Sequence, residues 1–214
     1  MDILVVTSII GTVAFSLSGA MVAMEEDYDV LGITVLGFLT AFGGGALRNM
    51  ILDLPMSIFW RQTNLFYVSF ATIFLVYFFP KKLMSWKKLE MFSDAIGLAA
   101  FSIQGALYGL DINGHIGPVI AAAILTGTGG GVLRDLLAGK KPNVLCTEIY
   151  GSWSILIAIF MYYTVPVNPV IYLVIIALTV GLRFAGSAYN WHLPKAFFFN
   201  ATSLNQLSEE EQDF

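Results

Sequence analysis

Long apolar segments alternate with short polar ones along most of this chain. Seven of these segments are long enough to form a membrane-spanning helix, which needs about 20 apolar residues to cross a hydrocarbon core roughly 30 Å thick. The pattern predicts spans near residues 3–23, 30–47, 63–80, 91–110, 115–137, 149–165 and 168–186. We therefore expect an all-α integral membrane protein with seven transmembrane helices.

The first half of this pattern returns in the second half at a constant spacing of 86 residues. Residues 11–20 (GTVAFSLSGA) match residues 97–106 (GLAAFSIQGA) at six of ten positions, and residues 39–48 (LTAFGGGALR) match residues 125–134 (LTGTGGGVLR) at seven of ten. Because each copy holds three spans, an odd number, the second copy must cross the membrane in the opposite direction. Inverted repeats of this kind are typical of channels and secondary transporters.

The repeat predicts how the chain is organised. We expect two inverted three-helix repeats, then a seventh helix and a polar tail: residues 1–88, 89–166, 167–187 and 188–214, respectively. The composition agrees, since 57% of the residues are hydrophobic and only 12% are charged. Too few polar groups are present to cover a soluble globule.

Few residues are suited to enzymatic or metal chemistry. A single cysteine excludes an intrachain disulfide, and one cysteine with two histidines is too little for a structural zinc site. The chain also has no nucleotide-binding loop and no nucleophile with a matching base. We expect no enzymatic activity, no cofactor, no nucleic-acid partner and no metal other than passing K⁺ or Na⁺.

The basic residues predict the orientation in the membrane. Nine of the eleven Lys and Arg residues fall in loops or span ends that share one side, and only Arg48 and Arg61 fall on the other. The positive-inside rule then places the N-terminus outside the cell and the C-terminus in the cytoplasm, in the cell (inner) membrane.

Three consecutive glycines interrupt two of the spans, at residues 43–45 and 129–131, formed by Gly43, Gly44, Gly45, Gly129, Gly130 and Gly131. Each glycine costs about 1 kcal/mol relative to alanine inside a helix. One interpretation is that both helices kink or unwind there near mid-membrane, so that bare carbonyls line a hydrated path for a monovalent cation. The alternative is close helix packing, for which glycine is common in membrane helices.

An arginine follows each triplet: Arg48 precedes Asn49, and Arg134 precedes Asp135. In the inverted arrangement these pairs lie towards opposite faces, as the two mouths of a path. The arginines would hold a broken helix or pair with a carboxylate, and Asp135 would attract a cation; snorkelling to the interface is the alternative. Asp94 is expected in a first helical turn, where a carboxylate suits the helix dipole, with proton coupling as the alternative.

Small polar residues at repeated positions are candidates for lining a pore. Each is also a candidate for a hydrogen bond between helices, worth about 0.6 kcal/mol. They are Ser16, Ser18, Thr40, Ser102, Gln104, Thr126 and Thr128.

The paired Gly-Gly-Gly-x-Leu-Arg-Asp/Asn tracts and the paired Ala-Phe-Ser-x-x-Gly-Ala tracts resemble the prokaryotic branch of the trimeric intracellular cation (TRIC) channel family, whose domain is sometimes labelled a glycine transporter. The resemblance covers nearly all of residues 1–186. It implies a homotrimer with a pore in each protomer, kinked helices at the two glycine runs, and passage of K⁺ and, less selectively, Na⁺.

Two hypotheses follow from these features. The first is a passive monovalent-cation channel, and the second is a transporter of glycine or a similar small amino acid that uses the same helix breaks. An ion-coupled transporter usually buries a carboxylate at mid-membrane, whereas here every Asp and Glu is expected near a span end or in a loop. That expectation favours the channel.

Overall fold

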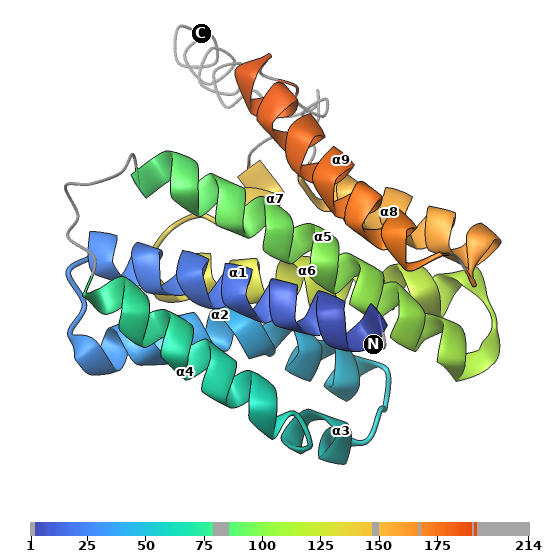
Figure 1. Ribbon diagram of the computed structural model, residues 1–214, viewed down its shortest axis with the longest axis horizontal. Coiled ribbons are helices and arrows are strands. Elements are labelled where there is room, and N and C mark those ends of the chain that lie inside the picture. The colour runs from blue at the N-terminus through green and yellow to red at the C-terminus, as the bar shows by residue number, and fades with distance from the viewer. Residues whose placement is uncertain (1–2, 79–85, 147–149, 167, 190, 192–214) are drawn as a thin grey trace, which may run out of the picture.

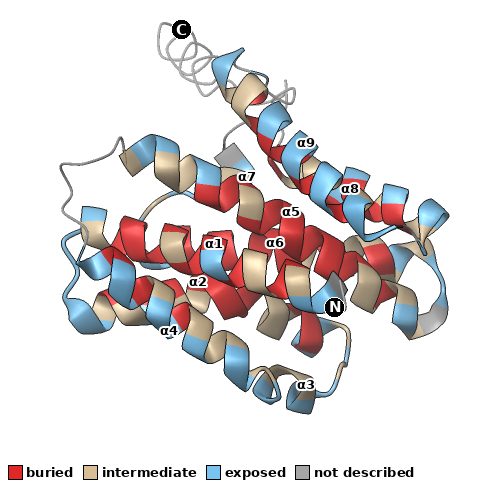
Figure 2. Cartoon of the chain, viewed as in Figure 1, coloured by how far each residue is buried: buried red, intermediate tan, exposed pale blue. Residues whose placement is uncertain are grey.

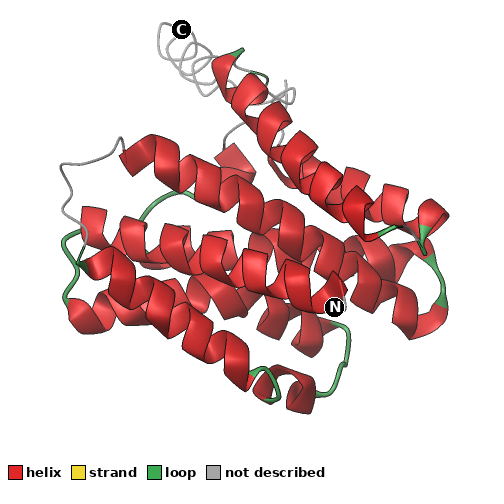
Figure 3. Ribbon diagram, viewed as in Figure 1, coloured by secondary structure: helices red, strands yellow, loops and turns green. Residues whose placement is uncertain are grey.

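The computed structural model describes residues 3–78, 86–146, 150–166, 168–189 and 191. Within these ranges the chain is helical and has no strand (Figure 1, Figure 3). The helices are α1 (Ile3–Glu25), α2 (Val30–Ile51), α3 (Met56–Trp60), α4 (Thr63–Tyr77), α5 (Trp86–Asn113), α6 (Ile116–Leu137), α7 (Asn143–Cys146), α8 (Tyr150–Thr164) and α9 (Pro169–Ala188).

The predicted all-α class is confirmed, but the count of seven spans is not. Each predicted span corresponds to one of the longer helices, while the short helices α3 and α7 were not predicted. By length and composition, five described helices are able to cross a membrane: α1, α2, α5, α6 and α9. Helices α4 and α8 have 15 residues each, and the spans predicted for them extend into residues 79–80 and 149, outside the described ranges. Seven spans therefore stay a prediction.

Side chains at the helix starts explain where two of these helices begin. Asp29 is the N-cap of α2, and its carboxylate accepts a hydrogen bond of 2.7 Å from Gly32 N. Asn168 caps α9 in the same way, and Pro169 occupies the first turn, where a missing N–H costs nothing.

Helices α1 and α5 pack antiparallel at the centre of the molecule. Gly11 faces the ring of Phe101, and Gly97 faces the ring of Phe15, which is the same contact with the roles of the two copies exchanged. The two rings meet edge to face with their centroids 5.2 Å apart. This reciprocal packing is what two inverted copies of one sequence produce.

Each copy also folds its first helix tightly onto its second. A Cβ on Gly19 of α1 would overlap the backbone of α2 at Leu36 and Gly37, and a Cβ on Gly105 of α5 would overlap the backbone of α6 at Ala122. Glycine is required at both positions because the helix backbones touch.

The remaining helices cover this core. Ser16 of α1 shares a hydrogen bond of 2.7 Å with Ser69 of α4, and Ser102 of α5 donates one of 2.8 Å to Ser154 of α8. Figure 2 shows the buried residues concentrated in the central helices and the exposed ones on the outer faces of α4 and α9. Helix α9 lies against α5 at the edge of the bundle (Figure 1).

We predict that Gly105→Ala lowers the stability of the protein by about 1–3 kcal/mol, because the added methyl group must push α5 away from α6. Gly181→Ala is the matched control: its Cβ meets no atom within 4 Å on α9, so the change should be neutral or stabilising. Thermal unfolding of the detergent-solubilised variants measures both effects. Equal melting temperatures for the two variants would contradict this account of the α5–α6 contact.

Candidate functional site

The two glycine triplets meet where α2 crosses α6. A Cβ on Gly44 would overlap the carbonyl oxygens of Leu125 and Thr126, and a Cβ on Gly130 would overlap that of Thr40. Gly44 and Gly130 are equivalent positions of the two copies, 86 residues apart, and they contact each other. The pseudo-two-fold axis of the repeat therefore passes through this crossing.

The expected unwinding at the triplets is wrong for this structure. All residues of 43–45 and 129–131 are helical, and α2 and α6 run through them without interruption. Helical hydrogen bonding satisfies the backbone groups that an unwound turn would leave bare. What the glycines supply here is the close packing that was the alternative interpretation.

The third glycine of each triplet distinguishes the two copies. A Cβ on Gly131 would lie 3.0 Å from Tyr150 Oη and 3.5 Å from Asp94 Oδ1, whereas a Cβ on Gly45 would meet no atom within 4 Å. The space beside α6 is thus filled by polar side chains, and the equivalent space beside α2 is open.

Arg134 is fully buried at one end of the core and is surrounded by carboxylates. Its Nη1 lies 2.8 Å from Asp94 Oδ1 and also donates to Ser18 Oγ, and its Nη2 lies 2.7 Å from Asp135 Oδ1. The other oxygen of Asp94 lies 2.7 Å from Nη1 of Arg183, on α9. We call these five residues the Arg134 cluster. Within it two guanidinium groups face two carboxylates, and a third carboxylate, that of Glu90, lies 3.9 Å from Arg134 Nη2.

Several expectations about this end of the molecule are corrected by the cluster. Asp94 lies more than two turns past the first residue of α5, Trp86, and is only 2% exposed, so it is not in a first turn. It joins α5, α6 and α9 instead. Asp94 is buried in the protein but lies level with Arg134 towards one end of the core, so the expectation that every carboxylate lies near a span end or in a loop stays a prediction.

Arg134 and Asp135 also differ from the simplest expectations. Arg134 does not snorkel, because buried carboxylates hold its guanidinium inside the protein. The second oxygen of Asp135 accepts a hydrogen bond of 2.8 Å from the backbone N–H of Asn143. Both carboxylate oxygens of Asp135 are thus engaged inside the protein.

Arg48 forms the corresponding cluster in the first copy. It is 2% exposed, so it does not snorkel either, and its Nε and Nη2 both donate to Asn49 Oδ1, at 3.0 and 2.8 Å. Its guanidinium lies over the ring of Tyr108, 4.0 Å from the centroid. Tyr108 lies about 21 Å along α5 from Asp94, at 1.5 Å per residue. The two arginines therefore lie towards opposite ends of the core, as the inverted repeat predicts.

A small cavity adjoins Arg48. It has a volume of about 20 Å³, and its lining includes two of the predicted pore-lining residues, Gln104 and Thr126, together with Gly45. A larger cavity of about 330 Å³ shares Gln62 and Gln104 with it. Both cavities thus have polar side chains in their lining, at the Arg48 end of the molecule.

The other predicted pore-lining residues are engaged elsewhere. Ser16 and Ser102 form the hydrogen bonds to α4 and α8, and Ser18 accepts from Arg134. Thr40 and Thr128 donate to carbonyl groups of their own helices. None of these five lines the cavity beside Arg48.

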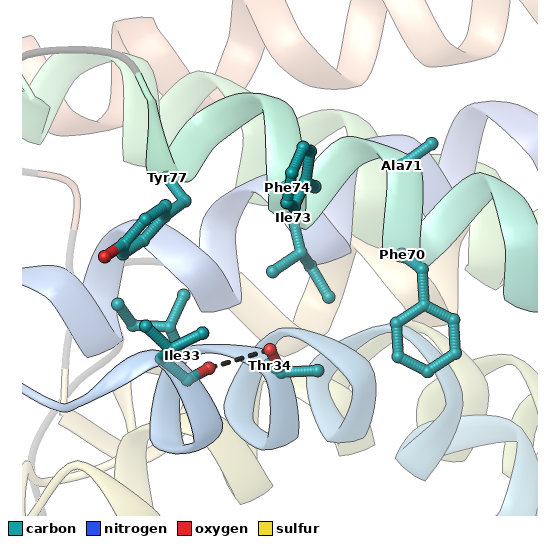
Figure 4. Close-up of a pocket in the computed structure, with 8 residues that line it drawn as sticks. Ile33, Thr34, Phe70, Ala71, Ile73, Phe74 and Tyr77 are labelled. Carbon is teal, nitrogen blue, oxygen red and sulfur yellow. Dashed lines mark hydrogen bonds between the residues drawn. The ribbon is translucent and has the colours of Figure 1, made fainter.

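An apolar groove of about 380 Å³ runs between α2 and α4 (Figure 4). Phe70, Ile73 and Tyr77 of α4 point towards α2, where Thr34 donates a hydrogen bond to Val30 O. None of the predicted site residues lines the groove. It is therefore separate from the two arginine clusters.

Sequence reasoning missed three members of the polar clusters: Tyr108, Tyr150 and Arg183. Arg183 also stacks on the ring of Tyr150, 4.2 Å from its centroid. No local pattern marks these residues, because each meets its partner from a different helix. One signal in the sequence could have singled out Asp94. The equivalent position of the first copy, 86 residues earlier, is Ser8, so the two copies differ there in charge.

Comparison with known proteins adds relatives of the whole chain. The family model described as glycine transporter matches residues 5–81 and 91–166. Membrane protein YvgT of Bacillus subtilis is 47% identical over 192 residues, which are 89% of this chain and 95% of YvgT. Inner membrane protein YadS of Escherichia coli is 37% identical over 195 residues, 86% of this chain and 91% of YadS.

Solved structures of TRIC channels share the fold. One prokaryotic TRIC channel, crystallised in 0.5 M KCl, superposes with a TM-score of 0.79 and 29% identity, over 89% of this chain and 98% of that one. The TRIC orthologue of Rhodobacter sphaeroides gives a TM-score of 0.78 and 26% identity, over 88% and 99% of the two chains. A third, solved to explain conductance through TRIC cation channels, gives 0.75 and 29%, over 91% and 97%.

The fold and the paired arginine clusters thus define a multi-pass membrane protein with the architecture of the TRIC channels. The chain belongs to the family that the glycine transporter model describes, and solved prokaryotic TRIC channels are its structural relatives.

We predict that Asp94→Asn destabilises the protein by about 3–5 kcal/mol, because it removes the carboxylate shared by Arg134 and Arg183 and leaves buried charge uncompensated. The double variant Asp94→Asn/Arg183→Gln should recover part of the loss, since Arg134 keeps Asp135. Ser102→Ala is the control and should cost only about 0.6 kcal/mol. Melting temperatures in detergent test the order; an Asp94→Asn variant as stable as Ser102→Ala would show that the cluster does not hold the helices together.

Proposed function

We propose that this protein is a channel for monovalent cations, with K⁺ preferred and Na⁺ permeant, and with one pore in each protomer of a homotrimer. The observation that carries the proposal is its structural likeness to prokaryotic TRIC channels, at TM-scores of 0.75–0.79 over about nine-tenths of the chain. The protein is then a non-enzymatic, multi-pass protein of the cell (inner) membrane. The distribution of basic residues favours an N-terminus outside and a C-terminus in the cytoplasm.

In this proposal the path runs between the Arg48 and Arg134 clusters, along the α2–α6 crossing. The backbones touch at Gly44 and Gly130, so this arrangement corresponds to a closed path. Opening requires α2 and α6 to separate or kink at the triplets, which glycine permits because Gly44 and Gly130 present no side chain to the facing helix. The freed space would be lined by backbone carbonyls, the natural ligands of a partly dehydrated cation.

We propose that the Arg134 cluster restrains this movement of α6. Arg134, which follows the triplet on α6, forms an ion pair with Asp94 on α5. Asp94 forms a second ion pair with Arg183 on α9. Any shift of α6 relative to α5 must rearrange these ion pairs. Asp135 and Asn49 make the two mouths chemically unequal.

Transport of glycine or a similar small amino acid is the second candidate. The description of the matching family model favours it. Broken helices would then contact both ends of the substrate. The two functions require different movements of the same crossing.

Electrical recording separates the two candidates. Purified protein in a planar bilayer with asymmetric KCl should give discrete current steps that reverse towards the K⁺ equilibrium potential. The same preparation in liposomes should show no saturable uptake of labelled glycine. A silent bilayer together with saturable glycine uptake would establish the transporter and refute the channel.

A second prediction tests the crossing as the gate. Leu133 of α6 fills the space beside Gly43 of α2, so Leu133→Ala should weaken the closed arrangement and raise the open probability by about tenfold, which corresponds to about 1.4 kcal/mol. Leu137→Ala, on an exposed part of the same helix, is the control and should leave gating unchanged. Single-channel recordings measure the open probability. Identical gating of Leu133→Ala and the unmodified protein would place the gate away from this contact.

A further inference from the structure

The two arginine clusters are built alike but differ in charge. Arg48 donates hydrogen bonds from Nε and Nη2 to Asn49 Oδ1. The same two nitrogen atoms of Arg134 contact Asp135 Oδ1. At the same 86-residue spacing, Ser8 stands in the first copy where Asp94 stands in the second. The two carboxylates that contact Arg134 most closely, those of Asp94 and Asp135, are thus replaced by neutral residues around Arg48.

The third guanidinium nitrogen of Arg48, Nη1, lacks the partner that its counterpart in Arg134 has. Arg134 directs Nη1 at Asp94, whereas Nη1 of Arg48 is buried and has no hydrogen-bond partner in the protein. Ser8 does not reach it, because its hydroxyl donates to Leu4 O and accepts from Gln104 Nε2. A buried guanidinium without a counter-charge costs several kcal/mol unless something else neutralises it.

Other unpartnered polar groups lie around the same place. Thr12 Oγ1 and Asn49 Nδ2 are buried without a hydrogen-bond partner, like Arg48 Nη1. Thr12 and Arg48 line the small cavity, together with the amide side chains of Gln62 and Gln104. None of the described residues that line this cavity, or the larger one that adjoins it, is acidic, and Arg61 lines the larger one. The site is rich in donors and positively charged.

The cavity limits the size of the ligand. A volume of about 20 Å³ exceeds the roughly 10–15 Å³ that one water-sized sphere needs, so the cavity holds a single small ligand. The unpartnered donors and the uncompensated charge of Arg48 call for a small acceptor that is negatively charged.

We propose that a chloride ion binds beside Arg48, held by Arg48 Nη1 and the hydroxyl of Thr12, with the amide groups of Gln62 and Gln104 around it. The ion supplies in the first copy the negative charge that Asp94 and Asp135 supply in the second. The larger cavity, which shares Gln62 and Gln104 with the site, is its route to solvent. Its effect on conduction rests on the proposed channel function: bound chloride would lower the barrier that Arg48 presents to a cation at that mouth.

Diffraction tests the binding directly. Crystals of the full-length protein grown in NaBr should show an anomalous bromide peak within hydrogen-bond distance of Arg48 Nη1, and crystals of Arg48→Gln should lack it. Ordered density at Nη1 without anomalous signal would mean that water satisfies the site, and the proposal would be wrong.

Stability provides a second readout that does not depend on channel activity. Replacing sodium gluconate by NaCl at constant ionic strength should raise the melting temperature of the unmodified protein, because chloride binds only the folded state. Ser8→Asp places a carboxylate at the position equivalent to Asp94, and Asn49→Asp does so at the position equivalent to Asp135. Each should weaken chloride binding by about tenfold or more, since a fixed charge replaces the mobile one.

The control for these measurements is Arg61→Gln, which removes a positive charge near the entrance but leaves Arg48 intact and should keep the chloride response. An equal chloride response in Asn49→Asp, Ser8→Asp and the unmodified protein would overturn the proposal. If the bromide peak is present but the protein conducts no current, the anion site is supported and the proposed channel function is refuted.

Discussion

Direct backbone contact between α2 and α6 at Gly44 and Gly130 is the constraint on which the rest of this structure depends. Apolar surface gives little driving force between helices in lipid, so close packing and interhelical hydrogen bonds must hold the bundle together. The glycines permit that packing, and because the contact lies on the pseudo-two-fold axis, each copy approaches the other at the same point. The reciprocal contacts of Gly11 with Phe101 and Gly97 with Phe15 follow from this geometry.

Much of the fold could be predicted because its information is periodic. The 86-residue repeat located equivalent helices and indicated their inversion, and the apolar segments located every longer helix. Helix ends were less predictable: α5 begins at Trp86, five residues before the predicted span, because charged residues can extend a helix beyond its apolar stretch. The short helices α3 and α7 carry no such period, and the 15 residues of α8 are fewer than the usual span.

The candidate site was predicted only in part, for a different physical reason. Arg48, Asn49, Arg134 and Asp135 were identified because they follow the triplets in sequence. Their partners come from elsewhere, since Asp94 is 40 residues before Arg134 and Arg183 is 89 residues after Asp94. The triplets themselves are compatible with either a break or a close contact. Which of the two occurs depends on the facing helix, and a local sequence carries no information about that neighbour.

The ion pair between Arg183 and Asp94 has a consequence for how the protein is made. Helix α9 is the last of the described helices to leave the ribosome, and an arginine at a helix centre opposes insertion by up to about 3 kcal/mol, less towards the end. Asp94 belongs to a helix synthesised earlier, so its carboxylate is in place when Arg183 arrives. We therefore expect α9 to enter the bilayer at low cost only beside a correctly assembled second repeat.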